Sequence, residues 1–134
     1  MIQKSNRIAI DVQGITITLK RIVTLLESEE EDEYGISQPT DYAFKTVMNL
    51  VLQVHCLMGN SFPRASASTD EEGGISLDWA SLDKERQVSL FCPFSPDKKA
   101  YIYHEKSDEY AVDYDVYTAN LAHWLQWFNF LINF

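Results

Sequence analysis

Two adjacent glycines followed by alternating apolar and polar residues constrain this chain more than any other feature. They occupy residues 73–79, which read Gly-Gly-Ile-Ser-Leu-Asp-Trp. Successive side chains of a β-strand point to opposite faces of a sheet, so Ile75, Leu77 and Trp79 are expected to share one buried face. The two glycines suit the tight turn of a hairpin. This stretch therefore predicts a β-hairpin in the second half of the chain, and it carries no chemistry of its own.

Further strands are predicted on both sides of this hairpin. Residues 64–69 form one candidate, 88–92 and 100–104 form two more, and 110–114 form either a fifth strand or an irregular return. The connections between them are short and rich in turn residues, as at Ser95-Pro96-Asp97. Consecutive strands with short connections favour an antiparallel meander, here of about four strands.

The first half of the chain has the periodicity of helices. Apolar residues recur near a 3.6-residue spacing over 15–28, and again over a broad stripe that Gly59 and Asn60 end. We expect Ser37 to cap the second helix and Pro39 to lie in its first turn, where a missing N–H costs nothing. The segment 27–33 holds six acids in seven positions and is predicted to be a solvated loop.

A last helix is predicted up to about residue 133, capped by Asp115 or Thr118. Its buried stripe is expected to contain Trp124, Leu125, Phe128, Leu131 and Ile132. Three further aromatic residues, Trp127, Phe130 and Phe134, lie off that stripe. Either they fold back over the sheet, or they form a patch that faces a partner, since aromatic residues are enriched at the cores of interfaces.

Together these elements predict one α+β domain over residues 1–134. The N-terminal helices are expected to pack on a small antiparallel β-meander, with a C-terminal helix added at the end. A chain of this length buries enough surface to fold without disulfides or metals. Cys56 and Cys92 are accordingly predicted to be two buried free thiols.

Charge and hydropathy limit the classes of partner. A formal net charge of -9 argues against nucleic acids and anionic membranes, which require clustered lysine and arginine. The apolar C-terminal stretch, residues 121–134, is shorter than the about 20 residues that cross a bilayer. The N-terminus shows no signal peptide, so a cytoplasmic protein is expected.

Catalytic and metal-binding spacings are not found in the sequence. His55 and Cys56 are neighbours on a helix and point about 100° apart, so they do not converge on one metal ion. His104 and His123 lie in other elements, and no H-x-x-x-H, C-x-x-C or G-x-S-x-G pattern occurs. The sequence predicts no catalytic residue, no metal ligand and no cofactor.

Tyrosines alternate with acids in the region 101–117, which suggests a recognition surface because tyrosine offers rigid, amphipathic contact area. Together with the three surplus aromatic residues, this region gives a candidate interaction surface. Its predicted members are Tyr101, Tyr103, His104, Glu105, Tyr110, Tyr114, Tyr117, Trp127, Phe130 and Phe134.

The chain also resembles a family of short, uncharacterised bacterial proteins. The resemblance rests on Glu33-Tyr34-Gly35, on Pro39, on Phe62-Pro63-Arg64, and on a T-x-x-x-G-G-I-x-L-x-W pattern over residues 69–79. It covers roughly residues 19–105 and implies a helical N-terminal half packed on a small antiparallel sheet. The family has no established activity, ligand or catalytic residue, so none is carried over. The acidic run and the aromatic C-terminal helix depart from its pattern.

Two classes of function follow from these observations. The first is a non-enzymatic, acidic interaction module that binds another protein, either a basic one that it neutralises or a second copy of itself in a homodimer. The alternative is a small-molecule-binding protein or minor enzyme that uses the tyrosine and acid cluster. That alternative predicts a closed pocket around Tyr101, Tyr103, His104 and Glu105.

Overall fold

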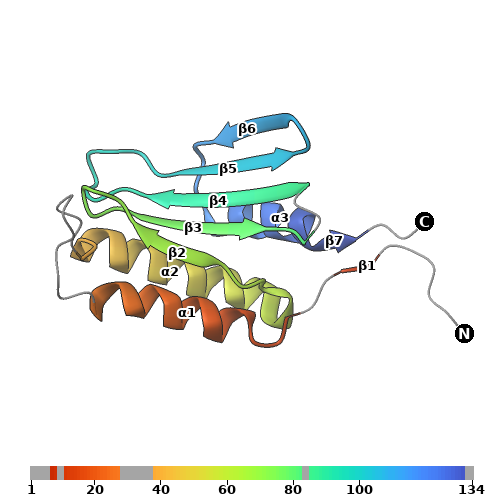
Figure 1. The fold of residues 1–134 in the computed structure, drawn as a ribbon, viewed down its shortest axis with the longest axis horizontal. Helices are drawn as coiled ribbons and strands as arrows, with labels where there is room; N and C mark the ends of the chain where they lie inside the picture. Colours follow the sequence, from red (N-terminus) through yellow and green to blue (C-terminus); the bar gives the residue numbers. More distant parts are fainter. Residues whose placement is uncertain (1–6, 9–10, 28–37, 83–84, 132–134) are drawn as a thin grey trace, which may run out of the picture.

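The computed structural model describes residues 7–8, 11–27, 38–82 and 85–131. Its fold is α+β, as the sequence predicts (Figure 1). The elements, in chain order, are β1 (Arg7–Ile8), α1 (Gly14–Thr24), the 3-10 turn η1 (Leu25–Glu27), α2 (Asp41–Met58), the 3-10 turn η2 (Gly59–Ser61), β2 (Ser66–Thr69), β3 (Ile75–Ala80), β4 (Arg86–Cys92), β5 (Tyr101–Lys106), β6 (Glu109–Asp113), α3 (Thr118–Asn129) and β7 (Phe130–Leu131).

The main sheet is an antiparallel meander of five strands in the order β2-β3-β4-β5-β6. The segment 110–114, which the sequence left open between a strand and an irregular return, contributes β6. A separate two-stranded pairing joins β1 to β7, so the two ends of the chain lie next to each other (Figure 1).

One face of the sheet carries the core. Ile75, Leu77 and Trp79 are fully buried, as the alternation predicts, and Val88, Leu90 and Ile102 continue the same face on the next strands. Buried residues of α1, α2 and α3 join them in one apolar cluster. Figure 1 shows α1 and α2 side by side near β2 and β3, with α3 behind β4. The described helices therefore cover one face of the sheet and leave the opposite face open.

The start of α2 differs from the prediction. Thr40, not Ser37, is the N-cap, and its hydroxyl oxygen accepts the N–H of Ala43 at 3.1 Å. The same hydroxyl donates to the carbonyl of Phe94 at 2.7 Å, and the N–H of Thr40 donates to the carbonyl of Gly73 at 3.0 Å. Pro39 therefore precedes the cap instead of lying in the first turn. Ser37 and most of the acidic run, residues 28–33, fall outside the described residues.

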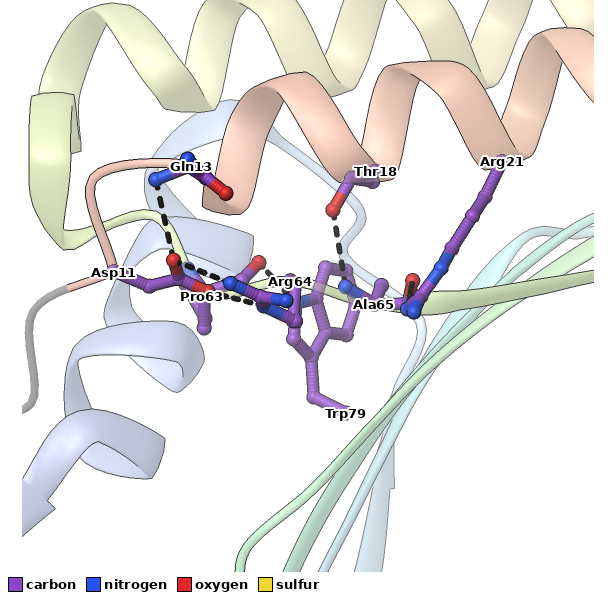
Figure 2. A network of polar contacts seen from close by, with 8 residues as sticks. All are labelled: Asp11, Gln13, Thr18, Arg21, Pro63, Arg64, Ala65 and Trp79. Carbon is purple, nitrogen blue, oxygen red and sulfur yellow. Dashed lines mark hydrogen bonds and ion pairs between the residues drawn. The ribbon is translucent and has the colours of Figure 1, made fainter.

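The segment between α2 and β2 is anchored by polar contacts to α1 and β3 (Figure 2). The indole N–H of Trp79 donates to the carbonyl of Pro63 at 2.9 Å. Arg64 forms a two-point ion pair with Asp11, at 2.6 and 2.9 Å. Pro63 and Arg64, with the glycine pair and Trp79, belong to the pattern on which the family resemblance rests. The contacts of Pro63 and Arg64 join the segment after α2 to β3 and to the residues just before α1.

A close backbone approach fixes where α1 begins. A Cβ atom built on Gly14 would lie 1.9 Å from the carbonyl oxygen of Phe62, a distance that no side chain tolerates. Glycine is therefore required at this position, because it alone lets the two backbones meet. This contact places the first turn of α1 directly against the segment that leads into β2.

The last helix ends earlier than the periodicity suggests. α3 stops at Asn129, where Phe130 turns to an extended conformation and begins β7. Its N-cap is Tyr117, without a side-chain cap, so the predicted caps Asp115 and Thr118 are wrong. Arg86 takes the place of a C-terminal cap by donating to the carbonyls of Trp127, at 3.0 Å, and of Phe130.

The two cysteines are both free. Cys92 is buried in β4, whereas Cys56 is exposed on α2, so the prediction of two buried thiols is wrong for Cys56. Cys56 faces away from the stripe that α2 buries, which the helical period places on Val47, Val51, Val54 and Met58.

Candidate functional site

The alternation of β5 divides the predicted interaction surface into two parts. Tyr101, Tyr103 and Glu105 point to the open face of the sheet, whereas Ile102 and His104 point to the helices. A closed pocket around Tyr101, Tyr103, His104 and Glu105 is therefore not formed, because His104 lies on the far side of the strand from the other three. The two parts are described separately below.

The open face is dominated by aromatic residues of the last three strands. The phenol ring of Tyr103 stacks on that of Tyr110 across the β5–β6 pair, with centroids 5.9 Å apart. Tyr101 contacts Phe91 on one side, at 5.2 Å, and Tyr114 on the other, at 6.2 Å. Cross-strand aromatic pairs of this kind stabilise a sheet and also present a firm apolar surface.

We call this surface the tyrosine face. Its members are Asp78, Ser89, Phe91, Tyr101, Tyr103, Glu105, Tyr110, Val112 and Tyr114.

Hydroxyl groups hold both carboxylates of the tyrosine face. The phenol of Tyr103 donates to the carboxylate of Glu105, and this bond raises the pKa of Tyr103. The hydroxyl of Ser89 donates to Asp78 at 2.6 Å. At the strand positions that point to this face, β2 through β6, Asp78 and Glu105 are the charged side chains. The face is therefore aromatic and purely acidic.

The helix side of β5 and β6 holds a shallow pocket of about 290 Å³. Its lining consists of His104, Lys106, Glu109, Tyr110, Ala111, Trp124 and Trp127. The imidazole of His104 lies flat on the indole of Trp124, with centroids 3.5 Å apart and planes inclined by 16°. Burial in this stack lowers the pKa of His104, although the nearby carboxylate of Asp113 acts in the opposite direction.

Asp113 lies two residues after Ala111 on the same side of β6 and is a firmly held anion. It accepts the backbone N–H of Asp115 at 2.9 Å and the side-chain amide of Asn120 at 3.2 Å. These bonds lower its pKa below the usual value for an aspartate. Asp113 therefore carries its charge throughout the physiological pH range.

The remaining predicted residues are scattered. Trp127 packs beneath the guanidinium of Arg86, 5.5 Å from its ring centroid, and so has an intramolecular contact that the helical period did not indicate. Phe130 lies in β7, and Tyr117 is exposed just before α3. Phe134 lies outside the described residues. Of the ten predicted residues, the tyrosine face unites Tyr101, Tyr103, Glu105, Tyr110 and Tyr114.

Sequence reasoning missed several members of both surfaces. Phe91 and Asp78 were treated as parts of strands, although each directly follows a buried leucine, Leu90 or Leu77, and alternation therefore places it on the other face. β6 lies at the edge of the sheet beyond the helices (Figure 1), so Ala111 stays exposed there and lines the pocket together with Trp124 of α3. The position of β6 depends on where the sheet ends, which no local pattern reports.

Neither a cluster of metal ligands nor a membrane-spanning helix occurs in the described residues. No group of three or more histidine, cysteine or acidic side chains there could hold a metal ion. Within the same residues, none of the helices is both long and apolar enough to cross a bilayer. In comparisons with known proteins, no family model, curated protein or solved structure matches the chain.

Proposed function

We propose that this protein is a non-enzymatic interaction module that binds a basic segment of another protein on its tyrosine face. The observation that carries the proposal is the composition of that face, which combines stacked aromatic rings with two carboxylates. The cationic residues of β4 and β5, Arg86 and Lys106, point to the helix side instead. Such a surface complements arginine and lysine, which stack on aromatic rings and pair with carboxylates.

The overall charge supports a basic partner. With a net charge of -9, the chain attracts cationic molecules over a distance and repels acidic ones. The hydroxyl groups that hold Asp78 and Glu105 keep both carboxylates in place before a partner arrives. Preorganisation of this kind reduces the entropy lost on binding.

A second copy of the chain fits the tyrosine face less well. Two acidic faces laid against each other would bury four carboxylates with no cation from either face. An unpaired buried charge costs several kcal/mol. The geometry therefore favours a basic protein over a homodimer formed through this face.

A small-molecule binder is the second candidate function, and the pocket beside His104 favours it. Its volume, about 290 Å³, lies just below the range for ligand sites, roughly 300–1,000 Å³. The tyrosine face extends over four strands, β3 to β6, and suits the larger footprint of a protein partner.

The proposal is tested by capture of a partner with two matched double variants. Glu105→Gln with Tyr110→Ser alters the tyrosine face, whereas Asp41→Asn with Tyr42→Ser makes the same chemical changes at exposed positions of α2. We expect the wild type and the α2 variant to retain the same basic protein from a lysate of the source cell. The tyrosine-face variant should retain at most a tenth as much, measured by quantitative mass spectrometry.

Two results would overturn the proposal. One is equal capture by the tyrosine-face variant and the wild type. The other is a captured partner whose binding segment, mapped by cross-linking, is acidic.

A further inference from the structure

The last strand of the sheet has a free edge. β6 pairs with β5 on one side, and no strand of the described residues lies on its other side. Its side chains are well exposed, with Tyr110 at 70% and Val112 at 40%. Every second residue of such an edge points its N–H and C=O groups outward, where they can pair with another strand.

The helix side of this edge has a distinctive pattern of charge and space. Glu109, Ala111 and Asp113 alternate along β6 and point toward the helices. Glu109 and Ala111 belong to the pocket lining, together with the indoles of Trp124 and Trp127. The small side chain of Ala111 thus lies between the carboxylates of Glu109 and Asp113, next to the pocket formed with the two indoles.

This pattern opposes pairing of two copies through β6. An antiparallel pair centred on Ala111 would place Glu109 of each copy directly opposite Asp113 of the other. Like charges in directly opposed positions destabilise a strand pair, and natural sheets use such charges to prevent edge-to-edge association. In this register the edge therefore disfavours its own copy. The two carboxylates favour a strand that carries cations, and Lys106 of β5 is the cation that already lies opposite Glu109.

We propose that β6 binds the basic partner by strand addition. The added strand runs antiparallel to β6, with a lysine or arginine opposite Glu109 and another opposite Asp113. Between them, opposite Ala111, stands a large apolar residue that enters the pocket beside Trp124 and Trp127. The recognised pattern is basic, any, apolar, any, basic.

This inference rests on the proposed function and adds the mode of binding and the sequence pattern. Main-chain hydrogen bonds supply affinity in strand addition, and pockets for alternate side chains supply specificity. The intervening side chains of the added strand lie beside Tyr110 and Val112, so the new strand also extends the tyrosine face.

A pair of synthetic peptides tests the pattern. The first is a fluorescein-labelled peptide of sequence Ser-Arg-Thr-Leu-Thr-Arg-Ser. The second, Ser-Thr-Arg-Leu-Arg-Thr-Ser, has the same composition but places its cations on the opposite strand face from leucine. We expect the first peptide to bind at least tenfold more tightly in fluorescence anisotropy titrations at low salt. Equal affinities would overturn the proposed pattern.

Backbone methylation tests the mode of binding. Two versions of the first peptide carry N-methyl groups at alternate residues, one version at odd positions and the other at even positions. An antiparallel ladder uses the N–H of every second residue. One version should therefore lose binding at least tenfold while the other retains most of it. Equal effects of the two methylation patterns would exclude a strand ladder.

A protein variant locates the site. Ala111→Lys fills the pocket entrance and places a cation between the two carboxylates, so we expect at least a tenfold loss of affinity for the first peptide. Ala119→Lys introduces the same change at an exposed position of α3 and should bind like the wild type. Circular dichroism of both variants verifies that they are folded. Wild-type affinity in Ala111→Lys would place binding elsewhere.

The inference and the proposed function fail in different ways. If capture of the basic partner depends on Glu105 and Tyr110 but is unchanged in Ala111→Lys, the tyrosine face is the site and strand addition is wrong. If capture is unchanged in both variants, the proposed function is wrong as well.

Discussion

The hydroxyl oxygen of Thr18 accepts a hydrogen bond from the backbone N–H of Ala65 over 3.0 Å, and both residues are fully buried (Figure 2). The carbonyl of Ala65 in turn accepts from Arg21, at 2.8 Å. One helix thus satisfies both backbone groups of the residue that leads into β2. Since buried backbone groups require partners, these two contacts with α1 stabilise the buried segment from which β2 begins.

Replacement of Thr18 by valine tests this link. Valine keeps the shape of threonine but leaves the N–H of Ala65 buried without an acceptor, which costs about 1–3 kcal/mol of folding free energy. Thr16→Val is the matched control on the exposed face of α1 and should change stability by at most about 0.5 kcal/mol. Urea unfolding followed by circular dichroism measures both. Equal effects of the two variants would contradict the role of Thr18.

Trp79 is the largest fully buried side chain, and its indole N–H donates to Pro63. Trp79→Phe removes that donor and leaves space beside Phe62, whose ring meets the indole edge to face at 6.2 Å. We expect a loss of roughly 2–4 kcal/mol in the free energy of unfolding. Tyr42→Phe, at an exposed aromatic position of α2, should be close to neutral in the same urea titration. A loss below that of Thr18→Val would show that the pocket around Trp79 closes after the substitution.

The stack of His104 on Trp124 predicts a pH dependence of stability. Because burial lowers the pKa of His104, the unfolded chain binds a proton more tightly than the folded one. The stabilisation is therefore complete above about pH 6.5, the unfolded value, and is lost as the pH falls through the lowered pKa of the folded protein. The urea midpoint of the wild type should therefore fall as the pH is lowered from 7.5 to about 5.5.

His104→Phe is the control for this pH dependence. Phenylalanine preserves a flat ring against Trp124 but does not titrate, so we expect a smaller decline of the midpoint over the same pH range. The NMR titration of His104 in the wild type should give a pKa below 6.5, the reference value for histidine. A value above this reference would mean that the charge of Asp113 outweighs burial.

The two thiols should differ in reactivity. Burial raises the pKa of Cys92 to about 12, whereas Cys56 is exposed on α2. Since the thiolate is the reactive form, a disulfide reagent such as Ellman's should label one thiol of the native protein at pH 8. Cys56→Ser should abolish this labelling, and Cys92→Ser should leave it unchanged. Labelling of both thiols before unfolding would show that β4 opens in the native state.

Much of the fold follows from local sequence patterns. The alternation around Ile75, Leu77 and Trp79 placed the buried face correctly, because strand geometry fixes which side chains share a face. Most of the apolar stripe of α2 was also predicted correctly, since apolar residues at helical spacing share one face, although Leu50 is buried with them and was not predicted to be. The errors fell at the ends of elements. Thr40 is the cap of α2 because Gly73 and Phe94, both distant in sequence, hold it in place.

The candidate site was predicted only in part. Alternation was sufficient to join Tyr101, Tyr103 and Glu105, and register with β6 then added Tyr110. His104 was grouped with them because it is their neighbour in sequence, although the same alternation sends it to the helix side. For Trp127 the choice between a contact with the sheet and a patch that faces a partner was left open, because nothing in α3 indicates that Arg86, 41 residues earlier, lies over its ring.

The sequence by itself determined the types and order of the main elements, apart from β6 and β7, and the apolar side of the central strands, because these depend on the spacing of side chains along one segment. Only the tertiary structure decided that all three described helices cover the same face of the sheet and that β6 lies beyond them, at the edge of the sheet (Figure 1). Those two outcomes create the open tyrosine face and the free edge. They depend on how much apolar area each packing arrangement removes from water, a sum over the whole chain that no single segment contains.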